Sequence, residues 1–140
     1  MTLTMPPLNL LAIIVAGLAA FLLGAVWYMA LFGKLWVKYN GYTPEQVAAM
    51  QKARPPQVFF GTMLLAYWLM ATLMGCLVYW AKAETLLDGV MVGLVAWGIV
   101  QAIAMTSYIS GDKRIEVYYL DGAYQFCFLV MTGIILTLWK

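Results

Sequence analysis

Four long runs of apolar residues, separated by short polar stretches, dominate the chain. They cover about residues 8–32, 57–81, 86–109 and 115–139. Each run is long enough to cross the hydrocarbon core of a bilayer, about 30 Å thick, because a helix rises 1.5 Å per residue and needs about 20 residues. The pattern predicts an all-α membrane protein. We expect four transmembrane helices in an antiparallel bundle, forming one transmembrane domain over residues 1–140.

The longest polar connection, about residues 33–56, is expected to contain a short amphipathic helix. Thr43-Pro44-Glu45-Gln46 has the pattern of a capping box with proline at the first helical position. Arg54-Pro55-Pro56 is expected to end that helix, because a proline disfavours helix at the residue before it. The prediction is a helix from about Pro44 to Ala53 on the membrane surface, after a turn out of the membrane at Gly33.

Composition and charge narrow the class of protein. Hydrophobic residues make up 65% of the chain, charged residues only 10%, and the mean hydropathy is +0.87. Soluble domains carry about 25% charged residues, so we exclude that class. The net charge is +2, and the sequence has no basic cluster typical of a nucleic-acid interface. The expected partners are therefore membrane lipids and no nucleic acid, while any small-molecule or ion ligand stays unknown.

The basic residues of the connections predict the topology. Positive charge is enriched on the cytoplasmic side of membrane proteins. The 33–56 connection and the 110–114 turn hold six basic residues, whereas the opposite side holds only Lys82 and Lys140. We therefore expect a multi-pass membrane protein with both termini outside the cytoplasm. The six basic residues are Lys34, Lys38, Lys52, Arg54, Lys113 and Arg114.

Aromatic residues near the ends of the apolar runs agree with this layout. Tryptophan and tyrosine are enriched where the bilayer meets water, because their rings are apolar and their tips are polar. We expect the membrane-interface anchors to be Trp27, Tyr28, Trp36, Trp80 and Trp139.

The residues that usually support catalysis are scarce. The chain has no histidine, and its two cysteines, Cys76 and Cys127, lie in apolar runs without the spacing of a metal or redox site. No phosphate-binding loop or nucleophile elbow occurs. We therefore expect that the protein is not an enzyme and that it binds no cofactor and no metal. Asp88, three residues after Thr85, is expected to cap the start of the third span.

Polar residues within the third and fourth runs form the candidate site. Tyr118, Asp121 and Gln125 share one helical face, and Gln101 on the antiparallel neighbour reaches a similar depth. An ionisable group at membrane depth is a functional hypothesis by default. Two interpretations stay open, which are hydrogen bonding between helices and a site that binds a cation or passes a proton.

Small residues recur every four positions in three of the runs. In lipid, helices associate through close backbone contact, which small side chains allow. The stripes are interpreted as seams between helices of one protomer or as a homo-oligomer interface. They comprise Ala16, Ala20 and Gly24 in the first run, Ala71 and Gly75 in the second, and Gly89 and Gly93 in the third.

One segment has a recognisable pattern, Trp27-Tyr28 through Phe32-Gly33-x-x-Trp36, followed by Gly41-Tyr42-Thr43-Pro44-Glu45. With the four apolar runs around it, the chain resembles the bacterial family called domain of unknown function 1761. The resemblance covers nearly the whole chain and implies a small four-span protein of the bacterial inner membrane. It implies no particular activity.

These features favour a structural or accessory membrane protein that self-associates. The alternative is a small proton- or cation-coupled transporter or channel with its pathway at a subunit interface and Asp121 as its ionisable group. A third hypothesis is a lipid-modifying enzyme that uses Tyr118, Glu116 and Asp121.

Overall fold

The structure, a computed structural model, describes residues 4–111 and 113–140, and no strand occurs among them. Four helical segments of the described chain are long and apolar enough to cross a membrane, as predicted. Their ends lie within two residues of the expected ones. The segments are α1 with its continuation η1 (Leu10–Ala25 and Val26–Leu31), α4 (Pro56–Trp80), α5 (Leu86–Ser110) and α6 (Ile115–Leu138).

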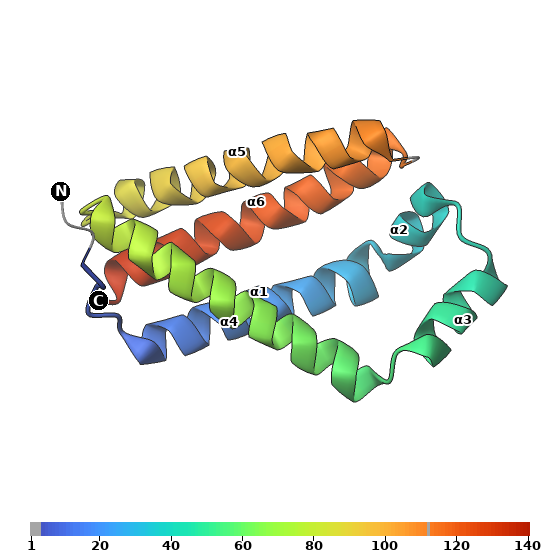
Figure 1. The fold of residues 1–140 in the computed structure, drawn as a ribbon, viewed down its shortest axis with the longest axis horizontal. Coiled ribbons are helices and arrows are strands. Elements are labelled where there is room, and N and C mark those ends of the chain that lie inside the picture. The colour runs from blue at the N-terminus through green and yellow to red at the C-terminus, as the bar shows by residue number, and fades with distance from the viewer. Residues whose placement is uncertain (1–3, 112) are drawn as a thin grey trace.

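The long helices are arranged around α6. Figure 1 shows α5 and α6 side by side and running in opposite directions, with α4 crossing α1 beside them. Helix α6 contacts α1, α4 and α5. The start of α1, the C-terminus and the link between α4 and α5 lie at one end of the molecule, and the connection between α1 and α4 lies at the other (Figure 1).

Small residues allow the helices to come close inside the protomer. Ala16 and Ala20 of α1 are completely buried. A methyl group added at Gly93 of α5 would come within 2.6 Å of the Val130 Cα and 2.7 Å of the Leu129 carbonyl oxygen, and Gly89 lies equally close to the α6 backbone. The stripes predicted from the sequence therefore pack helices of this protomer against one another.

The first span differs from its prediction at its end. It changes at Val26 from an α-helix into the π-helix η1, in which the Phe32 N–H donates to the carbonyl of Trp27, five residues earlier, at 2.7 Å. Gly33 was expected to turn the chain away, but it begins the further helix α2 (Gly33–Asn40) instead. A side chain at Gly33 would collide with the Tyr28 carbonyl, so glycine permits this tight junction.

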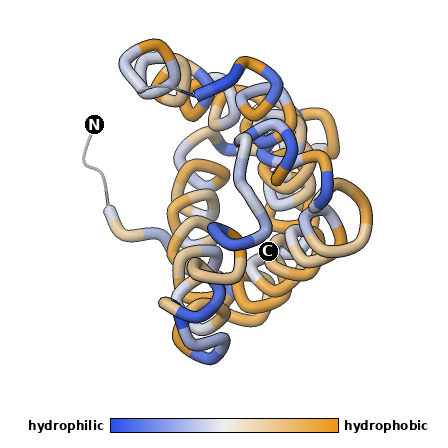
Figure 2. The backbone as a smooth tube through the Cα atoms, turned by 90° about the vertical axis from the view of Figure 1, so that its right-hand side faces the viewer, coloured by the Kyte–Doolittle hydropathy of each residue, from blue (hydrophilic) through white to orange (hydrophobic). Residues whose placement is uncertain are grey.

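The polar connection contains the predicted short helix α3 (Pro44–Ala53). The Thr43 hydroxyl accepts from the Gln46 N–H, and the Gln46 side chain accepts from the Thr43 N–H, which completes the capping box. Gly41, with φ of 71°, ends α2 in the left-handed conformation that glycine adopts easily. Seen from this end of the molecule, the coils are mainly hydrophobic and the hydrophilic residues gather in short stretches (Figure 2).

Candidate functional site

A tyrosine and a carboxylate meet where η1 packs against α6. The Tyr28 hydroxyl donates to Asp121 Oδ1 at 2.6 Å, and both side chains are half-buried. The two residues are 93 positions apart in the chain. Asp121 lies six residues into α6, about 9 Å along the helix axis from its start. An acidic group at this depth needs a donor, and Tyr28 supplies it.

The segment from Trp27 to Tyr42 supplies the aromatic rings around this pair. The Trp36 ring packs edge-on against Tyr28 with centroids 6.4 Å apart, and Trp36 also lies 5.6 Å from Tyr42. Trp27 packs against Phe32, with ring centroids 4.6 Å apart. The π-helix and α2 therefore bring the distinctive residues of this segment together next to Asp121.

Two of the predicted membrane-interface anchors pack inward against other helices. Trp27 and Tyr28 pack against the hydrophobic core, and the buried Trp27 Nε1 has no hydrogen-bond partner among the described residues. The helical register that the π-helix sets turns both rings inward, toward α6. Trp80 and Trp139 lie at the opposite end, where the Trp80 Nε1 donates to the Thr4 carbonyl at 3.3 Å and Trp139 is exposed.

A second polar contact lies deeper in the bundle. The Tyr124 hydroxyl donates to the Ala20 carbonyl at 2.8 Å, and it lies 2.6 Å from the Tyr67 hydroxyl on α4. Tyr124 was not among the site residues predicted from the sequence. Tyr124 is three positions after Asp121, on the neighbouring face of α6, and that spacing was the available signal. The pair joins α1, α4 and α6 near the middle of the spans.

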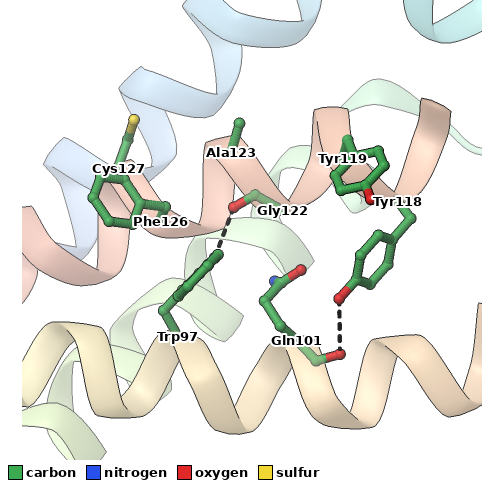
Figure 3. A pocket seen from close by; sticks show the side chains of 8 residues that line it. All are labelled: Trp97, Gln101, Tyr118, Tyr119, Gly122, Ala123, Phe126 and Cys127. Atoms are coloured by element: carbon green, nitrogen blue, oxygen red, sulfur yellow. Dashed lines mark hydrogen bonds between the residues drawn. The ribbon is translucent and has the colours of Figure 1, made fainter. Parts of the chain in front are cut away.

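The predicted glutamines meet on the other side of α6. Gln101 Nε2 donates to Gln125 Oε1 at 2.6 Å, and the Tyr118 hydroxyl donates to the Gln101 carbonyl at 3.3 Å. Figure 3 shows Tyr118 and Gln101 facing one another, with the Trp97 indole N–H directed at the Gly122 carbonyl, a bond of 2.9 Å. These residues border a shallow pocket of about 420 Å³ between α5 and α6.

The predicted cluster is therefore divided into two parts. Gln101, Gln125 and Tyr118 lie together between α5 and α6, whereas Asp121 bonds Tyr28 on the side of η1. The same division separates Tyr118 from Asp121 in the lipid-modifying hypothesis. In the described part of the chain, no group of three or more His, Cys, Asp or Glu side chains is placed to hold a metal ion. In each part, the hydrogen bonds join two neighbouring helices.

Four apolar helices, joined by hydrogen bonds between spans, define a small multi-pass membrane protein. The chain belongs to the family described as Protein of unknown function (DUF1761), which matches residues 11–137. The match includes the whole Trp-Tyr…Phe-Gly-x-x-Trp segment and confirms the resemblance. No curated protein and no solved structure matches the chain.

Proposed function

We propose that this protein is a structural or accessory protein of the bacterial inner membrane that self-associates through α5. Its four spans form an antiparallel bundle within the bilayer, with both termini outside the cytoplasm, and it has no catalytic activity of its own. The hydrogen-bond pairs of the candidate site serve in this proposal to fix the packing of the helices.

The observation that carries self-association is a stripe of small residues on the uncovered face of α5. Gly98, Ala102 and Thr106 follow one another at intervals of four and are all exposed, and a methyl group added at Gly98 would meet no described group of another helix within 4 Å. Gly89 and Gly93 are already covered by α6. The remaining stripe is accessible for close contact with a helix of a second copy.

The total exposed surface agrees with this proposal. The protomer exposes 9277 Å², whereas a compact soluble protein of 15.6 kDa exposes about 7,200 Å² by the usual scaling with mass. Large hydrophobic side chains of the spans, such as Leu69, Val95 and Ile103, are more than half exposed and have to be covered by lipid or by another copy.

The test is the stoichiometry of the protein reconstituted in liposomes, measured by single-molecule photobleaching. We expect a dimer or larger oligomer for the wild type. Gly98→Leu should weaken association by about tenfold or more, which corresponds to roughly 1.4 kcal/mol, because the larger side chain separates the two backbones. The matched control is Gly61→Leu, since Gly61 of α4 is also exposed and has open space around it. A monomeric wild type, or equal behaviour of both variants, would refute the proposal.

The contact between Tyr28 and Asp121 favours a second candidate, a proton- or cation-coupled transporter. A carboxylate within a span is a functional hypothesis, and π-helical segments occur frequently at functional sites. A proton flux in liposomes that Asp121→Asn abolishes, and that Glu116→Gln in the exposed first turn of α6 leaves intact, would support this candidate. The absence of any flux in the wild type would leave the accessory function.

A further inference from the structure

A groove lies at the end of the molecule where the first span meets its polar connection. Its volume is about 560 Å³, and its walls come from η1, α2 and α3. The left-handed turn at Gly41 and the cap at Thr43 lie in the link that joins α2 to α3. We call it the α2–α3 groove, and the lining residues that matter here are Met29, Lys34, Val37, Tyr42, Val47 and Gln51.

The lining combines apolar side chains with one cation. Met29, Val37 and Val47 supply apolar surface, and Met29 is 72% exposed although it belongs to the span. Lys34 adds an ammonium group and Gln51 an amide to the same groove. An occupant that satisfies all of these groups has an apolar part and an anionic part.

The charge around the groove has the sign that attracts anions. Besides Lys34, the segment from residue 33 to 55 carries Lys38, Lys52 and Arg54, against the single acid Glu45. The pKa of Glu45 is lowered by hydrogen bonds from its own backbone N–H and from the Thr43 side chain, so it is ionised at neutral pH. The balance of the segment is therefore three positive charges.

The position of the groove selects a lipid over a soluble anion. Met29 belongs to the first membrane span and Lys34 follows three residues after its end at Leu31. The groove therefore begins at hydrocarbon depth and opens where headgroups lie. Basic pockets at the ends of spans bind anionic headgroups through charge and hydrogen bonds.

We propose that the α2–α3 groove binds one anionic phospholipid. The phosphate pairs with Lys34, Gln51 donates to the headgroup, and the glycerol end of an acyl chain lies against Met29, Val37 and Val47. The site is separate from the α5 stripe, so it holds for a monomer and for an oligomer alike.

The experiment is native mass spectrometry of the full-length protein, purified in detergent and titrated with phosphatidylglycerol or phosphatidylcholine. We expect one phosphatidylglycerol to bind preferentially. Lys34→Gln should weaken that binding about fivefold, the effect of one basic residue at a lipid surface. Val47→Trp, which fills the groove and leaves every charge in place, should weaken it as well.

The matched control is Lys82→Gln, which removes the same charge at the opposite end of the molecule. It should bind phosphatidylglycerol like the wild type. Equal binding of both lipids, or equal loss in Lys34→Gln and Lys82→Gln, would overturn the proposal. Titration with inorganic phosphate separates the two sources of the anion. If phosphate binds in a Lys34-dependent way while phosphatidylglycerol does not, the groove is an anion site and the lipid site is refuted.

Discussion

The hydrogen bond between Tyr28 and Asp121 joins two side chains that are 93 positions apart in the chain. Hydrogen bonds between helices in membranes contribute about 0.6 kcal/mol on average and about 1.7 kcal/mol at most. The bond therefore stabilises the fold modestly. Its larger consequence is geometric, because it fixes which face of η1 is turned toward α6.

Replacing Tyr28 by phenylalanine tests this contact. The change keeps the ring and its packing against Trp36 and removes only the hydroxyl that donates to Asp121. We expect the free energy of unfolding, measured by titration from mild detergent into SDS, to fall by about 0.6–1.7 kcal/mol. Tyr79→Phe is the control, since Tyr79 is 46% exposed. An equal effect of the two changes would show that the Tyr28 hydroxyl stabilises nothing.

At the residue scale, the sequence predicted where a polar residue lies along its span better than it predicted the hydrogen-bond partner of that residue. Counting positions along the fourth apolar run placed Asp121 within the span, and the capping pattern predicted the bonds from Glu84 and Thr85 N–H to Asp88. The partner of Asp121 could not be predicted, because it lies 93 residues away in the chain and the apolar pattern does not define which face of α6 is turned toward which helix.

At the scale of elements, the π-helix at the end of the first span is the feature that the sequence did not predict. An apolar run with helical composition has the same pattern whether its hydrogen bonds join residues four or five positions apart, so the run from residue 8 to 32 predicted only a continuous helix. The extra residue in the turn changes the register of everything after it. That change places Trp36 beside Tyr28.

Deleting Met29 tests the role of that extra residue. The deletion shortens η1 by one position, so that the Phe32 N–H and the Trp27 carbonyl become four positions apart and an ordinary α-helical turn replaces the wide turn that leads into α2. We expect the amides of α2 to lose protection against hydrogen exchange by about tenfold or more. Met29→Ala is the control, because the exposed side chain is lost while the register is kept. If the deletion leaves protection unchanged, the π-helix does not position α2.

The seam between α5 and α6 gives a second prediction at this scale. In Gly93→Ala the added methyl meets backbone atoms of Leu129 and Val130, which cannot move without displacing α6. Gly61→Ala is the same chemical change at a site with open space, and both variants gain helix propensity equally. We expect Gly93→Ala to be less stable than Gly61→Ala by about 1–3 kcal/mol in the same SDS titration. Equal stability would mean that the helices are not in close contact.

At the scale of the whole molecule, hydropathy alone was sufficient to locate the four spans. Their lengths follow from bilayer thickness, and caps such as Thr43 and Thr85 define helix starts locally. The contacts between spans were less predictable. Small residues such as Gly93 and Gly98 look alike in the sequence, but α6 covers one and leaves the other exposed.

The distribution of charge over the molecule leads to the last prediction, the orientation in the membrane. Six of the eight basic residues belong to the connection between α1 and α4 and to the turn between α5 and α6, which lie at one end (Figure 1). The positive-inside rule predicts that this end is cytoplasmic. Lys82→Cys and Gln51→Cys are a matched pair at opposite ends. In spheroplasts, we expect a membrane-impermeant maleimide to label Lys82→Cys at once and Gln51→Cys only after permeabilisation. The reverse pattern would invert the topology and, with it, the leaflet in which the α2–α3 groove meets its lipid.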